Sequence, residues 1–201
     1  MLFLYLSDSN SGESRDLLRP DDYSKLLFYC CVLQSYPSAL IRKKYISKKD
    51  ALLKLQRYCA YQDRCHQEVR RKLRDLGIYG DDLEEIIVEL IGENFLNEER
   101  YARSYARGKF RVKKWGRDRI RQELKKRNIS AYCLRKGLEE IEESLYLDTL
   151  REVILKRNTK TTAKTEFERG AKLGQYALSR GYESALVWNT IRQLREEGLL
   201  S

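Results

Sequence analysis

The residues most able to do chemistry in this chain are positively charged, and they are concentrated in one window. Residues 100–127 hold thirteen Lys or Arg and only two acids, Asp118 and Glu123, which leaves eleven surplus positive charges. The whole chain carries +10, so the remaining residues are close to neutral. Guanidinium and ammonium groups bind phosphates and carboxylates. The window therefore predicts a surface for an anionic partner, either nucleic-acid phosphates or an acidic protein surface.

The neighbouring segments allow a second interpretation of the same charges. Residues 81–99 contain eight acids and no base, and residues 139–143 read EEIEE. Ion pairs between neighbouring helices could therefore neutralise part of the basic window internally. Like charges at helical spacing destabilise a helix slightly, by about 0.2–0.5 kcal/mol per pair. A purely structural face would be expected to alternate its signs, so the sequence favours the anion-binding interpretation.

Catalytic chemistry has little support in the residues. The one histidine, His66, directly follows Cys65, and adjacent helical side chains diverge, so the two are not expected to form a catalytic pair. No phosphate-binding glycine motif occurs. The five cysteines are odd in number and lack metal-site spacing, which favours free thiols in a reducing cytosol. We expect a non-enzymatic cytoplasmic protein with no cofactor, no metal and no membrane segment.

A repeat of about fifty residues predicts the elements that position these charges. Segments 68–96, 119–147 and 172–200 align in their apolar positions, and their turn column reads Gly77, Asn128 and Gly181. Gly and Asn tolerate the left-handed backbone that ends a helix. Each segment therefore predicts a helix, a tight turn and a second helix.

A further helix is expected before each of these pairs. Asn97 is a suitable N-cap for the one in the middle repeat, and Tyr101, Ala102, Tyr105 and Ala106 form its apolar stripe. The predicted fold is all-α: three tandem three-helix repeats that form an elongated, curved rod. Its expected divisions are a partly disordered N-terminal leader at 1–46, with a short helix at 23–36, and repeats at 47–96, 97–147 and 148–201.

The basic residues fall on two helices of the middle repeat and on the junction between them. Arg103, Arg107 and Arg111 share one face of the helix that begins at Asn97, and Gly116 is expected to cap the next helix. Trp115, at the junction, could contact a partner or pack as core, and core is favoured, as it is for Trp188. The predicted contact set is Arg103, Arg107, Lys109, Arg111, Lys113, Lys114, Trp115, Arg117, Arg121 and Lys125.

Two further functional hypotheses use the same residues. A DNA-binding protein built from helix-turn-helix-like units would place Arg117, Arg119 and Gln122 at the reading end of a helix. An adaptor for an acidic protein would contact no DNA. A binding titration against salt separates the two, because phosphate contacts give a steep salt dependence.

Two stretches resemble a known family. FLNEERYARSYARGKF (95–110) followed by KKWGRDRIRQELKKRNIS (113–130) resembles the central repeat of the RecX family of bacterial recombination regulators. LGQYALSRGYESALVWNTI (173–191) is similar to the closing repeat of that family. The resemblance covers about residues 47–201. Asn128 stands where the family usually has Gly, and residues 1–46 have no counterpart in its pattern.

The resemblance implies a partner as well as a fold. Members of the family bind the RecA recombinase in the groove of its filament on single-stranded DNA. They restrain its ATPase, strand-exchange and co-protease activities, and so act on DNA repair, recombination and the SOS response. Some members bind DNA directly, so single- or double-stranded DNA is a further expected partner. We expect this chain to act as a monomer.

Overall fold

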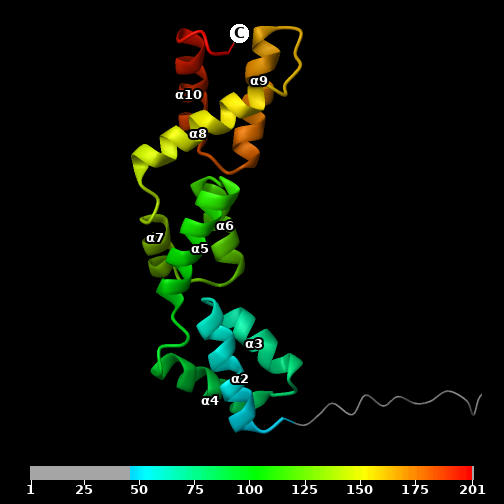
Figure 1. The fold of residues 1–201 in the computed structure, drawn as a ribbon, viewed down its shortest axis with the longest axis vertical. Helices are drawn as coiled ribbons and strands as arrows, with labels where there is room; N and C mark the ends of the chain where they lie inside the picture. The colour runs from blue at the N-terminus through cyan, green and yellow to red at the C-terminus, as the bar shows by residue number, and fades with distance from the viewer. Residues whose placement is uncertain (1–45, 201) are drawn as a thin grey trace, which may run out of the picture. The chain divides into compact units, whose positions relative to one another are not determined.

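The part of the chain that the computed structural model describes, residues 46–200, is built from α-helices and contains no strand (Figure 1). The all-α prediction is therefore confirmed for these residues, whereas the expected leader and its helix at 23–36 lie outside them. None of the described helices is long and apolar enough to cross a membrane. The helices are α2 (Lys48–Tyr61), α3 (His66–Asp75), α4 (Gly80–Gly92), α5 (Glu98–Lys113), α6 (Arg117–Lys126), α7 (Ala131–Leu138), α8 (Glu143–Asn158), α9 (Glu166–Ser179) and α10 (Ser184–Glu196).

The three predicted turns have one geometry. Gly77, Asn128 and Gly181 have φ angles of 85°, 56° and 87°, so all three adopt the left-handed backbone. In each turn the following residue donates its backbone N–H to the carbonyl five residues earlier, with N···O distances of 3.0, 3.2 and 3.3 Å. This is the hydrogen bond of the Schellman motif, which satisfies a carbonyl at a helix end. The turn column read from the sequence is confirmed in all three helix pairs.

The helices form three successive groups of three, and we call them the first unit (α2–α4), the second unit (α5–α7) and the third unit (α8–α10). The first unit has its own apolar core, which includes Leu55, Leu73 and Leu90. The second and third units share one continuous core, in which the rings of Phe110 in α5 and Tyr146 in α8 lie 5.8 Å apart. The second and third units are therefore joined by apolar packing, and the first unit is closed largely on itself.

The helix signals of the sequence agree in most details with the structure. The Asn97 side chain accepts a hydrogen bond from the N–H of Arg100, and Gly116 is the N-cap residue of α6. The helix α8 begins at Glu143, so it continues across the position where the second repeat was expected to end. The prediction that Trp188 belongs to the core was wrong, because its side chain is 41% exposed and covers Gly174 at the surface. A side chain on Gly174 would collide with that ring.

The junction between the second and third units is unusually close. The N–H groups of Gly116 and Asp118 donate to the carbonyls of Arg180 and Gly181, at 2.9 and 3.0 Å. The Gly181 turn thus satisfies two N–H groups at the start of α6, groups that a helix cannot satisfy internally. A Cβ atom on either glycine would overlap the opposite backbone. This contact fixes the N-terminal end of α6, a helix that carries part of the basic window, against the third unit.

Candidate anion-binding surface

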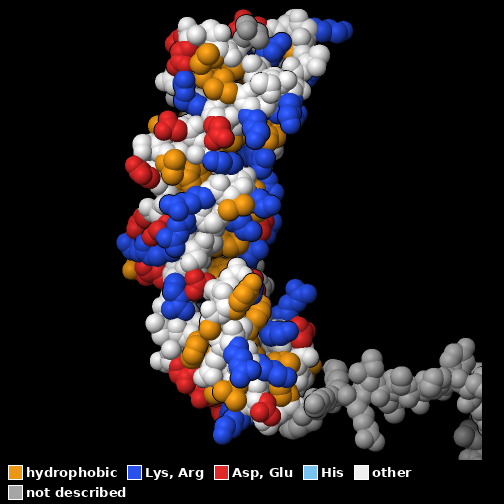
Figure 2. All heavy atoms as spheres, in the orientation of Figure 1, with side chains coloured by type: hydrophobic (Ala, Val, Ile, Leu, Met, Phe, Trp, Pro, Cys, Tyr) orange, Lys and Arg blue, Asp and Glu red, His pale blue; other side chains and the backbone are white. Residues whose placement is uncertain are grey.

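The predicted contact set lies on α5, on α6 and on the short linker between them, and we call it the basic surface. Lys and Arg side chains gather over these helices in the face shown in Figure 2, with acidic side chains among them. The Tyr101, Ala102 and Ala106 stripe of α5 is buried and Tyr105 is half-buried, so α5 turns its arginines outward. The prediction from helical spacing, that α5 buries this stripe and carries its arginines on another face, is confirmed.

About half of the cations of the basic surface are paired with carboxylates, from their own helix or from a neighbouring element. The guanidinium of Arg103 binds Glu99 at 2.8 Å and Glu140 at 2.5 Å, and the hydrogen bond that it donates to Glu140 raises the pKa of Arg103. The remaining pairs of this kind are Arg107–Glu140 at 3.9 Å, Lys114–Glu152 at 3.4 Å, Arg117–Glu143 at 2.6 Å and Arg121–Asp118. The alternative of neutralisation between neighbouring elements is therefore realised for four of these cations, and Arg121 is paired within α6.

The other cations of the basic surface have no carboxylate partner among residues 46–200. Arg111, Lys113 and Lys125 are exposed and form no ion pair there. Lys109 lies 5.1 Å from the centre of the Tyr105 ring and 5.4 Å from that of Trp115. The surplus charge is therefore concentrated at the C-terminal end of α5 and on α6, where an anionic partner would not have to displace a carboxylate of the described residues.

Trp115 belongs to the core side of the junction, as the sequence favoured. It is half-buried and packs against the shared core, and the guanidinium of Arg119 lies 4.3 Å from its ring centre. Arg119 also donates a hydrogen bond to the carbonyl of Ser179 in the third unit. Two cations, Lys109 of α5 and Arg119 of α6, thus lie against one ring and link the two helices through cation–π contacts, and the hydrogen bond from Arg119 links them to α9.

The N-terminal end of α6 is not free to read base edges. Arg117 donates to Glu143 and to the carbonyl of Ile141, and its guanidinium covers the Tyr146 ring at 4.2 Å. The Arg117 N–H donates to the Tyr146 hydroxyl at 3.1 Å, and Arg119 is held by Ser179 and Trp115. Only Gln122 of the three proposed reading residues is exposed. The geometry therefore does not favour the helix-turn-helix interpretation.

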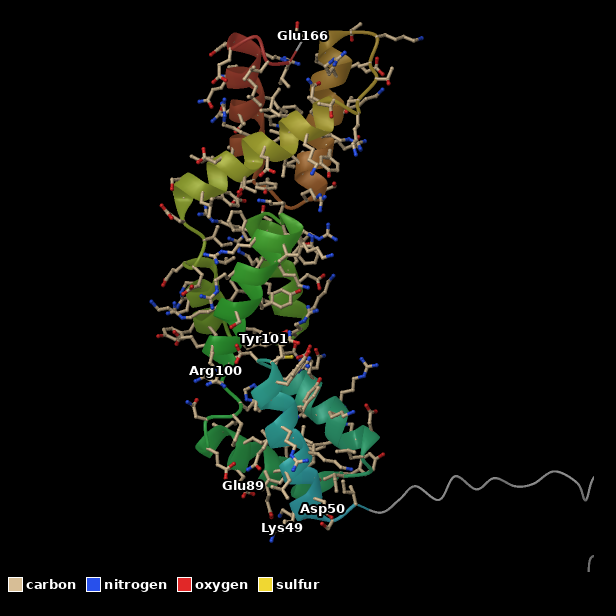
Figure 3. All side chains as sticks on the ribbon, in the orientation of Figure 1. Lys49, Asp50, Glu89, Arg100, Tyr101 and Glu166 are labelled. Atoms are coloured by element: carbon tan, nitrogen blue, oxygen red, sulfur yellow. The ribbon has the colours of Figure 1, made fainter. Side chains whose placement is uncertain are left out.

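A polar cluster between the first and second units was not anticipated from the sequence. Asp63 accepts hydrogen bonds from Arg100 at 2.8 Å and from Ser104 at 2.6 Å. Burial would raise the pKa of Asp63, but the hydrogen bonds from Ser104 and Arg100 outweigh it and lower the pKa. Figure 3 shows Arg100 near the start of α5. The signal available in the sequence was only an acid in the loop after α2, which does not indicate a partner 37 residues away.

No cluster of metal-ligating side chains occurs among residues 46–200. The described cysteines, Cys59, Cys65 and Cys133, are buried free thiols, and burial raises the pKa of Cys59 to about 11. Cys65 is the N-cap residue of α3 and His66 is its first residue. Burial also raises the pKa of Cys65, so this thiol is held in its protonated, weakly nucleophilic form.

Comparison with known proteins agrees with the predicted resemblance. Residues 97–138 match the second three-helix domain of RecX, and residues 144–191 match the third. The regulatory protein RecX of Herminiimonas arsenicoxydans is 30% identical over 143 residues, which cover 70% of this chain and 89% of that protein. The RecX of Bacillus cytotoxicus is 24% identical over 147 residues, 73% of this chain and 54% of that protein.

A solved structure extends the likeness to the fold. The crystal structure of RecX from Lactobacillus salivarius matches with a TM-score of 0.67 and 25% identity, over 74% of this chain and 97% of that one. The chain spans about half the length of the Bacillus relatives that it matches. The relatives bear the name of regulatory protein. From its sequence identity and its fold together, this chain belongs to the RecX family of regulatory proteins.

Proposed function

We propose that this chain binds the RecA recombinase filament and restrains its ATPase, strand-exchange and co-protease activities. Through RecA it would act on DNA repair, recombination and the SOS response, in the cytoplasm and as a monomer. The observation that carries the proposal is membership of the RecX family, joined to a basic surface that is only half neutralised. In this proposal the chain acts by binding to the RecA filament, and no covalent bond is made or broken.

The exposed cations make the first contribution to binding. Arg111, Lys113 and Lys125 form no ion pair within the described residues, so they can meet phosphates or carboxylates without first losing a partner there. Cations of this kind accelerate encounter and determine the register of a complex. Where they contact DNA, binding weakens steeply as salt rises, because bound phosphates release their counterions. The neutralised members of the basic surface contribute after their pairs open.

The test is an ATPase assay of RecA on single-stranded DNA with a charge-reversed variant. We expect the wild-type chain to inhibit hydrolysis at up to equimolar amounts. The variant Arg111→Glu, Lys113→Glu and Lys125→Glu should lose at least about tenfold in inhibitory potency, since three contacts change from attraction to repulsion. These three side chains are exposed, so the fold should survive the change.

A matched control separates the basic surface from net charge. Lys160→Glu, Lys164→Glu and Arg192→Glu alter the net charge by the same amount at exposed positions of the third unit. This control should inhibit nearly as well as the wild type. If the wild type fails to inhibit RecA at low salt, the proposed function is wrong. If the two variants lose the same potency, the basic surface is not the contact.

A further inference from the structure

Glu140 occupies the centre of the N-terminal half of the basic surface. It follows α7, and one of its carboxylate oxygens lies 2.5 Å from Arg103 while the other lies 3.9 Å from Arg107. Its side chain is 24% exposed, so it lies partly below the arginines that it binds. One acid thus serves two arginines that are spaced by four residues on α5.

The close packing of α7 against α5 places Glu140 there. A Cβ atom on Gly137 would lie 2.8 Å from the carbonyl oxygen of Ala102, so only glycine allows the two helices to approach this closely. Glu140 comes three residues after Gly137 and is carried to the outer side of α5. The position of this acid is therefore set by the packing of the unit and not by a mobile loop.

The side chains around Glu140 surround an open hollow of about 490 Å³. Three arginines line it, Arg100, Arg103 and Arg107, together with Glu99 and Glu140. Of these arginines, Arg100 is bound to Asp63 and Arg103 is bound to Glu99 as well as to Glu140. Arg107 has Glu140 as its only carboxylate partner in the described part of the chain. Loss of the Glu140 charge would therefore leave Arg107 fully available and Arg103 partly available.

We propose that Glu140 is an intramolecular competitor of DNA, which occupies Arg103 and Arg107 until a phosphodiester group replaces it. This inference rests on the proposed function of the basic surface. A phosphodiester is favoured over a protein carboxylate because two further unpaired cations, Arg111 and Lys113, follow Arg107 along α5 at exposed positions, as contact with a repeating backbone requires. A phosphate that binds Arg103 or Arg107 must first displace the Glu140 carboxylate, so Glu140 lowers the affinity of this site for a single anion. A polyanion loses less affinity, because it also binds the unpaired cations.

Glu139 provides a matched control for Glu140. It precedes Glu140 directly, but it binds Lys136 at 2.9 Å and forms no ion pair with Arg103 or Arg107. Its side chain is 56% exposed. Glu139→Gln and Glu140→Gln remove the same charge from adjacent positions and preserve side-chain size, so they differ chiefly in which cations they release.

The experiment measures the affinity of each variant for an oligothymidylate single strand, without RecA, at fixed salt. Glu140→Gln should bind about twofold to fivefold more tightly than the wild type, which is the range expected for the loss of one competing surface ion pair. Glu139→Gln should change the affinity by less than half of that factor. In a background of Arg103→Gln and Arg107→Gln, the gain from Glu140→Gln should disappear.

Three results would overturn the inference. Equal gains from both glutamine variants would mean that only net charge matters. A gain that persists in the Arg103→Gln and Arg107→Gln background would mean that Glu140 acts elsewhere, and absence of single-strand binding would exclude the phosphodiester. The RecA ATPase assay with the same variants distinguishes the two proposals. Inhibition without single-strand binding leaves the proposed function standing, whereas the expected affinity changes without inhibition leave this inference standing.

Discussion

The contact between the Gly181 turn and the start of α6 leads to a sharp prediction about stability. Gly181 has a φ of 87°, and a Cβ atom there would lie 2.5 Å from the backbone nitrogen of Arg119. Gly77 has nearly the same φ, 85°, but has open space around its missing Cβ. Alanine at either position therefore has the same backbone strain, but only the methyl group of Gly181→Ala would collide with another unit, at Arg119.

The expected losses in unfolding free energy follow from backbone strain and steric overlap. A non-glycine residue in the left-handed region costs roughly 1–2 kcal/mol, which is the whole expected loss in unfolding free energy for Gly77→Ala. Forcing a methyl group into a filled contact costs about 1–3 kcal/mol more. Gly181→Ala should therefore destabilise the protein by about 2–5 kcal/mol. Part of this loss would come from opening the hydrogen bonds that Gly116 and Asp118 donate to the turn.

Urea unfolding measures the difference. Both tryptophans, Trp115 and Trp188, lie in the second and third units, so tryptophan fluorescence reports on the shared core, whereas far-ultraviolet circular dichroism reports on all helices. Gly181→Ala should lower the fluorescence midpoint, and Gly77→Ala should act mainly on the first unit. If Gly181→Ala costs no more than Gly77→Ala, the close junction does not exist in solution and the reasoning fails.

Two further predictions concern single polar groups. Hydrogen bonds from Lys126 and then Arg127 lower the pKa of Glu123 from 4.5 to about 2. The stabilisation that ionised Glu123 gives the folded state is therefore complete above about pH 5 and is lost as the pH falls toward 2. The unfolding free energy of Glu123→Gln should be lower than that of the wild type by about 1 kcal/mol at neutral pH and should equal it in acid. A difference that stays constant with pH would contradict this. Tyr146→Phe leaves the Glu183 carboxylate and the Arg117 N–H without their buried partner and should cost about 1–3 kcal/mol in thermal unfolding. Tyr182→Phe, which loses only a 3.3 Å hydrogen bond to the Lys114 carbonyl, should cost clearly less, and equal losses would refute the proposed role of the Tyr146 hydroxyl.

Local signals in the sequence predicted the elements well. The left-handed turns at Gly77, Asn128 and Gly181 could be read because few residue types tolerate that backbone. The caps at Asn97 and Gly116 and the buried stripe of α5 depend on neighbours within one or two helical turns. The prediction of a buried Trp188 was wrong because a large apolar side chain usually indicates burial. In the structure this ring packs over Gly174 at the surface and stays partly exposed.

The members of the basic surface could be named from the sequence, but their pairing could not. Arg103 and Lys113 belong to the same run of basic residues, yet one is bound by Glu99 and Glu140 and the other has no acid partner among residues 46–200. Glu140 is 37 residues from Arg103 along the chain, and only the packing of α7 against α5 brings them together. No periodic pattern records such a distance.

The sequence by itself determined the helical class, the repeat, the three turns and the surplus of positive charge, because each depends on residue type and short spacing. The tertiary structure decided which positive charges remain available. It also decided that the second and third units share a core and that their backbones meet at two glycines that no pattern marks as partners, Gly116 and Gly181. An ion pair or a close backbone contact depends on distances between helices, and those distances are set by how whole units pack.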